Sequence, residues 1–212
     1  MTWEDGRFPL VILENRACHY AVVQELYAEV RGGRGRFVLS EGEHLLDAVK
    51  SLEVLVSPWD MDFSGRKVMT AFYARVKQAL QDGERLAAAQ EAASAAARCA
   101  ELLGDAFTLP VAYDEAADIP ALMKAIHFRP ALPEGPLAEQ MLSYMELCTE
   151  LLGTACFVFC GFRRFLPEEE LHGLYHTAFL KKLHFLLLEN TAPGIVEEEE
   201  PFIIDEDLCQ IF

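Results

Sequence analysis

The sequence lacks the features that mark membrane-spanning, secreted and disulfide-bonded proteins. No apolar run among its 212 residues approaches the roughly 20 residues that a membrane-spanning helix needs, and the start of the chain lacks the basic and apolar segments of a signal peptide. The six cysteines include no C-x-x-C pair and lie mostly in apolar segments, which is typical of buried reduced thiols. These absences predict a cytoplasmic protein, and a hydrophobic content of 52% is enough for a core of one large or two small domains.

Positive charge is also scarce. Lys and Arg number 18 against 34 Asp and Glu, which gives a formal charge of −16 and argues against nucleic-acid binding over a broad surface. Any DNA binding must therefore be local. The same charge favours a protein-binding scaffold, which stays open as one class of function.

A phosphate-binding loop is missing where an α/β nucleotide-binding protein would carry it. The apolar run FPLVILEN (8–15) predicts a buried strand, and RACHYAVVQELYAEV (16–30) predicts an amphipathic helix that ends at RGGRGR (31–36). Glycines between strand and helix would allow backbone N–H groups to hold a phosphate, but Glu14, Asn15 and Arg16 stand there. This turn counts against a second class of function, a degenerate nucleotide-binding enzyme.

The last third of the chain predicts a β-α-β unit. Two apolar runs, ACFVFCGF (155–162) and HFLLLEN (184–190), flank the helical segment PEEELHGLYHTAFLKK (167–182), and a parallel crossover requires such a helix. An acidic tail follows, in which EEEE (197–200) is most simply a solvated loop. Together with the N-terminus, these elements predict an α/β head domain with a mostly parallel sheet, similar to a nucleotide-binding fold without its phosphate loop.

Helical segments separate the two α/β stretches. Residues 65–104, rich in Ala and straight-chain residues, predict a long helix with Gly83 as the place for a bend, and shorter helices are expected at 114–126 and 136–152. We therefore expect an inserted helical leg at 65–153 between head segments 1–64 and 154–212. Its apolar residues face more than one side, which predicts burial against itself or another subunit.

Two further patterns leave alternatives open. Glu14 and Glu189 end the two strands LVILEN and FLLLEN, where open α/β sheets bind ligands, so they form a shared metal or polar site, or they cap helices and pair with arginines. His172 and His176 have the spacing of metal ligands on a helix, but without the general base of H-E-x-x-H a surface pair is favoured. No Ser or Cys has the local signature of an acyl-transfer nucleophile.

The order of these segments resembles the adaptation protein of type II-A CRISPR systems, in its short, ring-forming variety. The matching segments are LVILEN, the stretch from FVLSEGEHLL to SPWDMDF (37–63), YDEAADIPALMKAI (113–126), FVFCGFRRFLPEEELHGLYHTAF (157–179), HFLLLEN and FIIDEDLCQIF (202–212). The resemblance implies a non-catalytic tetrameric ring with bound calcium. It also implies a positively lined hole that holds double-stranded DNA ends during spacer acquisition, and docking to other CRISPR adaptation proteins, namely the integrase complex and the effector nuclease.

The resemblance also implies candidate site residues. The segment 109–118 matches the calcium-binding region, where Asp114, Glu115 and Asp118 carry carboxylates, while Pro110 and Ala112 stand where acidic residues are expected. The alternative is that these acidic residues only begin a helix.

The candidates for contacts with DNA phosphates are the basic residues of the leg and of two loops. In the alternative, each is a solvated side chain without a partner. They are Arg75, Lys77, Lys124 and Arg129 in the leg, and Arg31, Arg34, Arg36, Arg163 and Arg164 in the loops.

Overall fold

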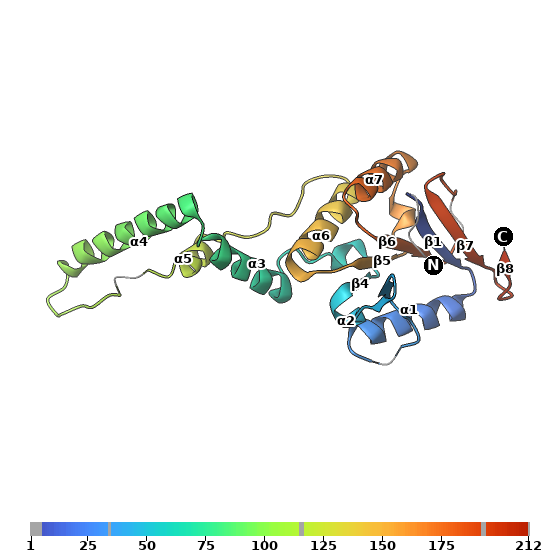
Figure 1. The fold of residues 1–212 in the computed structure, drawn as a ribbon, viewed down its shortest axis with the longest axis horizontal. Coiled ribbons are helices and arrows are strands. Elements are labelled where there is room, and N and C mark those ends of the chain that lie inside the picture. The colour runs from blue at the N-terminus through green and yellow to red at the C-terminus, as the bar shows by residue number, and fades with distance from the viewer. Residues whose placement is uncertain (1–5, 34, 115–116, 192–193, 212) are drawn as a thin grey trace. The chain divides into compact units, whose positions relative to one another are not determined.

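The computed structural model describes residues 6–33, 35–114, 117–191 and 194–211 (Figure 1). The chain divides into two units. The first unit comprises Met1–Phe63 and Leu132–Phe212, and the second unit comprises Ser64–Ala131.

A six-stranded sheet forms the centre of the first unit. Its strand order is β4 (Leu52–Leu55), β5 (Cys156–Cys160), β6 (Phe185–Glu189), β1 (Phe8–Leu13), β7 (Glu199–Ile204) and β8 (Gln210–Ile211). All neighbours pair in parallel except β7 and β8. The predicted mostly parallel α/β fold is therefore confirmed. A separate antiparallel pair, β2 (Ser40–Glu41) and β3 (His44–Leu45), lies outside this sheet.

Both faces of the sheet are buried at β1, β5 and β6, as their apolar runs predict. Because side chains alternate along a strand, Leu10 and Ile12 of β1 join one core cluster, while Leu13 joins the other. Helices α6 (Leu137–Leu152) and α7 (Glu168–Leu180) pack on the first cluster, in which Phe8, Tyr175 and Phe185 stack. Helix α1 (Arg16–Val30) covers the second cluster, with the short α2 (Ala48–Ser51) before β4.

The turn after β1 is built to start a helix. The side chain of Asn15 accepts a hydrogen bond from the backbone N–H of Cys18 at 3.0 Å and so caps α1. This cap uses one of the N–H groups that a bound phosphate would need. The turn therefore serves the fold, in agreement with the missing phosphate loop.

The described residues of the second unit contain three helices, α3 (Arg66–Ala79), α4 (Gly83–Gly104) and α5 (Ile119–Ala125). The sequence predicted one long helix over 65–104 with a bend at Gly83. Instead, α3 ends at Ala79, residues 80–82 are not helical, and Gly83 begins a new helix. The predicted helix at 114–126 is shorter than expected, because Asp118 caps its first turn. No residue of α4 is buried within this chain.

The predicted extent of the helical leg differs from the structure at α6. The sequence placed 136–152 in the leg, but the second unit ends at Ala131. Met141, Met145 and Cys148 on one side of α6 are fully buried in the core of the first unit, beneath the sheet. An apolar helix face does not reveal from sequence whether a sheet or another helix will cover it.

Among the described residues, no helix is long and apolar enough to cross a membrane. The six cysteines are free, but only Cys148, Cys156 and Cys160 are buried, while Cys99 and Cys209 are exposed. The expectation of buried thiols therefore holds for half of them. Burial raises the pKa of Cys156 and of Cys160 to about 12, which keeps both thiols protonated near neutral pH.

Candidate nucleic-acid interface and metal site

Charge is divided very unevenly between the two units. Eight of the 18 Lys and Arg residues and eight of the 34 Asp and Glu residues lie in 64–131, so the second unit is neutral overall. The first unit therefore carries the whole net charge of −16. A polyanion such as DNA is expected to avoid the first unit as a whole.

Within the second unit, positive charge gathers on two helices. Helix α3 contains four basic residues and no acidic one, and α5 contains Lys124 and no acidic residue. The segment that follows α5 adds Arg129, again without a carboxylate before Ala131. The acidic residues of this unit lie in α4, at 82 before it, and at 105–118 after it. The unit is thus neutral in total and polarised along its sequence.

Aromatic contacts bring the two basic helices together. The Tyr73 hydroxyl donates a hydrogen bond to the backbone carbonyl of Phe128 at 2.8 Å, and the Phe72 and Phe128 rings lie 5.4 Å apart. The Lys124 ammonium lies 5.0 Å from the centre of the Tyr73 ring, in a cation–π arrangement. Lys124 is thereby held on α3 instead of extending freely from α5.

The other candidate basic residues of this unit, Lys77, Arg129 and Arg75, are exposed. Lys77 lies one turn after Tyr73 on the same side of α3, and Arg129 directly follows the residue that accepts the Tyr73 hydrogen bond. Arg75 is exposed as well, and its guanidinium donates to the side-chain carbonyl of Gln78 at 3.0 Å. We use the name basic cluster for Lys77, Lys124 and Arg129, which are grouped around Tyr73.

The loop arginines after α1 have different surroundings. The Arg36 side chain pairs with Glu25, which lowers the pKa of that carboxyl group, while Arg31 stacks over the Tyr27 ring at 5.1 Å. Both arginines are exposed, whereas Arg34 lies outside the described residues. The acidic partner of Arg36 weakens the case for a phosphate contact there.

Arg163 and Arg164 are neighbours with opposite environments. They lie in a 3-10 turn, η2 (Arg163–Phe165), that follows β5. Arg163 is buried, and its Nε donates to Glu199 Oε1 at 2.9 Å, while its Nη2 donates to the Gly194 carbonyl at 2.7 Å. Arg164 is exposed. The structure therefore argues against Arg163 as a DNA contact, because its guanidinium is already used inside the core.

The run EEEE at 197–200 is not the solvated loop that its composition predicted. Glu199 begins β7 and is buried, and besides Arg163 its carboxylate accepts hydrogen bonds from the Tyr175 hydroxyl and the Val196 N–H at 2.6 and 2.9 Å. A buried carboxylate is stable only with such partners. One member of the run is thus a structural residue.

Glu189 caps a turn. It is buried at the end of β6 and accepts the Arg163 backbone N–H at 2.9 Å. Burial raises the pKa of Glu189 to about 7, although the hydrogen bond from Arg163 opposes this shift. Glu14 lies two residues beyond Ile12, the β1 residue that pairs with Glu189. Of the two alternatives for these residues, capping is observed for Glu189.

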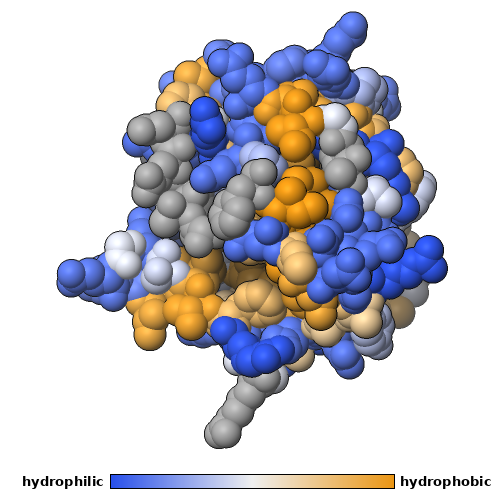
Figure 2. Space-filling view, turned by 90° about the vertical axis from the view of Figure 1, so that its right-hand side faces the viewer, coloured by the Kyte–Doolittle hydropathy of each residue, from blue (hydrophilic) through white to orange (hydrophobic). Residues whose placement is uncertain are grey.

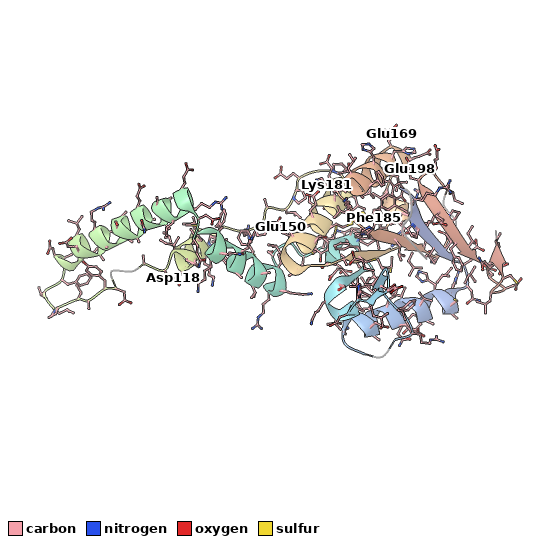
Figure 3. All side chains as sticks on the ribbon, in the orientation of Figure 1. Asp118, Glu150, Glu169, Lys181, Phe185 and Glu198 are labelled. Carbon is pink, nitrogen blue, oxygen red and sulfur yellow. The ribbon has the colours of Figure 1, made fainter. Side chains whose placement is uncertain are left out.

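The described residues do not bring the predicted calcium ligands together into a metal site. The Asp118 side chain accepts the Ala121 N–H at 3.3 Å as the cap of α5, and Figure 3 labels it there. Asp114 is exposed, and Glu115 lies outside the described residues. No group of three or more His, Cys, Asp and Glu residues suited to a metal occurs in the described part of the chain. Two carboxylates do not supply the six to eight oxygens that calcium requires.

Of the two histidines on α7, His172 contacts a carboxylate. His172 Nδ1 lies 2.7 Å from Glu198 Oε1, and this contact raises the pKa of His172 and lowers that of Glu198. Figure 3 labels Glu198 beside α7, which carries His172. The contact is an ion pair between α7 and the start of β7, in line with the favoured surface role.

One pocket opens between α1 and the sheet of the first unit, with a volume of about 430 Å³. Val11, Val22, Leu26 and Val158 are among its lining residues, and no described residue that lines it carries a charge. Figure 2 views the side of the molecule where β7 and β8 lie and shows hydrophobic residues around a hollow. A nucleotide phosphate finds no partner in such a lining.

The fold and these placements define an α/β protein that lacks a phosphate-binding loop after β1 and carries basic residues without acidic ones on α3 and α5 of its helical unit. The family described as "CRISPR-associated protein (Cas_Csn2)" matches residues 30–208 of the chain. The chain belongs to this family of type II-A CRISPR adaptation proteins, and its role is CRISPR-associated. The resemblance seen in the sequence is thereby confirmed.

A solved structure supports the fold. The crystal structure of Stu0660 of Streptococcus thermophilus matches with a TM-score of 0.58 and 12% sequence identity, covering 91% of this chain and 68% of that chain. At this identity the likeness concerns the fold alone. No curated protein matches the chain.

Sequence reasoning missed the residues that organise the basic cluster. Tyr73 and Phe128 stand 55 positions apart, and no local pattern announces their hydrogen bond. The signal that was available is the absence of carboxylates from α3 and α5, which a charge count by segment reveals.

Proposed function

We propose that this protein acts in spacer acquisition as a non-catalytic, calcium-dependent tetramer in the cytoplasm. The tetramer forms a ring that binds the ends of double-stranded DNA without sequence preference. The basic cluster carries this proposal, because its cations are exposed and lie on or next to two helices, α3 and α5, that contain no acidic residue, in a protein of net charge −16. Family membership supports the adaptation role.

Contacts by Lys77, Lys124 and Arg129 would be to the phosphate backbone. Such contacts position a protein on a duplex but do not read its bases. The remaining exposed candidates are Arg75, Arg31, Arg36 and Arg164, of which Arg36 is paired with Glu25. Arg34 lies outside the described residues, and Arg163 is set aside because it is buried. Proteins of the integrase complex and the effector nuclease are the proposed partners.

Exposed apolar residues of the second unit support the tetramer. Leu102, Leu103, Phe107 and Leu109 lie at the end of α4 and just after it, and each is more than half exposed. Large apolar residues clustered on a surface favour association with another chain. A ring needs such contacts between subunits.

Calcium fits the single chain poorly and belongs to the proposal only at the level of the assembly. Asp118 already caps α5, so Asp114, Glu115 and Asp118 would need further oxygen ligands from another chain or from water. A tetramer carries a formal charge of about −64, four times −16, and divalent cations reduce that repulsion.

A gel-shift comparison of linear and relaxed circular duplexes tests the proposal. A ring must be threaded from a free end, so the linear duplex is expected to bind and the circle is not. Lys124→Glu with Arg129→Glu should abolish binding while light scattering still reports the tetramer. Lys50→Glu is the matched control, because Lys50 is an exposed cation of the first unit outside the proposed interface. Equal binding to both duplexes would exclude threading and favour the protein-binding scaffold.

A further inference from the structure

Trp59 is the most exposed large hydrophobic residue in the described part of the chain, at 83%. It lies in the 3-10 turn η1 (Pro58–Asp60), where the Ser57 hydroxyl accepts its backbone N–H at 3.3 Å. Pro58 precedes it, and Met61 directly after the turn is buried. The indole is therefore presented to solvent by a turn whose backbone is fixed on both sides.

A second aromatic ring and a guanidinium accompany Trp59. The Phe165 ring meets the indole edge to face, with centroids 6.1 Å apart at 77°. The Arg164 guanidinium lies over Phe165, 4.7 Å from the ring centre. It also packs beside Gly161, where a Cβ would come within 3.7 Å of Nη2 and φ is +74°. We use the name aromatic site for Trp59, Phe165 and Arg164.

The position of this site in the fold is that of a ligand site. Turn η1 follows β4 and η2 follows β5, and these strands are parallel neighbours in which Leu55 pairs with Phe159. The site thus lies at the carboxyl ends of two adjacent parallel strands, where open α/β sheets bind their ligands. Arg163, buried directly before Arg164, fixes η2 from below through Glu199.

From this arrangement we infer that the aromatic site binds an unpaired nucleotide, with the base stacked on the Trp59 indole and the adjoining phosphate at the Arg164 guanidinium. Every nucleobase offers a planar face, so stacking of this kind tolerates any sequence. The inference rests on the proposed function and deepens it, since it makes unpaired bases at a DNA end a feature that the protein recognises.

The surroundings favour a nucleotide over a protein partner. Of the residues near Trp59 and Phe165, Ser57 and Asp60 are polar and Met61 and Leu166 are buried, while the apolar Pro58 is partly exposed and Val56 is 40% exposed. The exposed apolar surface there is thus limited to the two rings with Val56 and Pro58, whereas a stable protein interface buries about 800 Å² on each partner. Asp60 beside Trp59 also predicts that stacking contributes more than charge.

Tryptophan fluorescence tests the inference directly. The chain contains two tryptophans, so Trp3→Phe leaves Trp59 as the single reporter. Titration with a short oligothymidylate should quench its emission, and Arg164→Ala should weaken binding with a salt slope smaller by about 0.7, the value for one single-strand phosphate. Absence of quenching overturns the inference and leaves the two rings as a contact for a protein partner.

Gel shifts with blunt and 3′-overhanging duplexes provide the second readout. Wild-type protein should prefer the overhang, and Trp59→Ala should lose that preference by on the order of tenfold while blunt-end binding persists. Trp59→Phe should retain part of it. Tyr20→Ala is the matched control, because Tyr20 is 68% exposed on α1 and outside both proposed sites. An unchanged preference in Trp59→Ala contradicts the inference.

The two proposals fail separately in these assays. Quenching by oligothymidylate without any binding of blunt duplex would leave the aromatic site standing and remove the ring function. Blunt-duplex binding without quenching would remove the aromatic site and leave the ring function standing.

Discussion

The Nε of Arg163 donates to Oε1 of Glu199 at 2.9 Å inside the core of the first unit, and the two residues lie 36 positions apart in the sequence. The pair joins the turn after β5 to the first residue of β7. Both side chains are buried, so neither charge has water as a substitute partner.

Arg163→Ala is expected to lower the free energy of unfolding by about 3–5 kcal/mol, because it leaves Glu199 buried without its cation. Urea denaturation followed by circular dichroism measures this loss. Arg164→Ala is the control and should change stability by less than about 0.5 kcal/mol, since Arg164 is exposed. Similar losses in both variants would show that the buried pair does not contribute more to the free energy of unfolding than an exposed arginine does.

Glu189 is expected to make stability fall as pH rises towards neutrality. Its folded pKa of about 7 lies above the ordinary value of 4.5, so the folded state holds a proton that the unfolded state releases. The resulting stabilisation is complete below about pH 4.5 and is lost as pH rises through 7. Its size is on the order of 3 kcal/mol.

Thermal melts between pH 4.5 and 8 test this dependence, and Glu189→Gln should flatten it. His172 contributes in the same direction, because its raised pKa favours the folded state at low pH. A His172→Asn background therefore isolates Glu189. If Glu189→Gln leaves the slope unchanged in that background, the carboxyl group does not titrate as inferred.

DNA affinity is expected to fall steeply with salt, because each phosphate neutralised by a cation releases condensed counterions. Lys124→Ala should lower affinity and reduce the log–log salt slope by about 0.9. Fluorescence anisotropy with a linear duplex at several potassium chloride concentrations gives both values. Lys50→Ala should leave the slope unaltered, and a slope unaltered in Lys124→Ala would remove that residue from the interface.

The oligomeric state depends on the apolar end of α4. Light scattering should give about four times 23.8 kDa for the wild type. Leu102→Asp with Leu103→Asp should reduce that mass, because both side chains are exposed in the single chain and α4 buries no residue there. Leu45→Asp, at an equally exposed position of β3, is the control. A tetramer that survives the double change assembles through another surface.

Removal of calcium by a chelator should loosen the tetramer or lower its melting temperature, since carboxylates then repel one another. Asp114→Ala with Glu115→Ala should copy that effect in the presence of calcium. Glu91→Ala removes an exposed carboxylate from the middle of α4 and should not. If chelation changes neither the mass nor the melting temperature, calcium does not hold the assembly together.

The centre of the sheet was predictable because β1, β5 and β6 are short apolar runs buried on both faces, whereas β7 is mostly half-buried or exposed and β8 is exposed. LVIL in β1, FVF in β5 and FLLL in β6 are apolar throughout, which is typical of parallel strands covered on both faces of a sheet. The absence of a phosphate site also followed from the sequence, since Asn15 replaces the needed glycines and caps α1 instead.

Side-chain environments were not predictable from local sequence. Arg163 and Arg164 are the same residue type at adjacent positions, and only the geometry of η2 buries the first and exposes the second. Glu199 stands among four glutamates, and its burial depends on a cation far away in the chain. The basic cluster likewise depends on a hydrogen bond between Tyr73 and Phe128 that no spacing rule indicates.

The placement of β1 determines when the chain can fold during its synthesis. Within the sheet, β1 lies between β6 and β7, which follow it at a long distance in the sequence and are therefore synthesised much later. At about 5–20 residues per second, the apolar segment 8–13 waits roughly 10–40 s for its first partner strands. The second unit is contiguous and can form its helices in that interval. The nascent chain therefore exposes an aggregation-prone strand until β6 and β7 emerge, and a stop codon before β7 should yield insoluble protein in place of a smaller folded one.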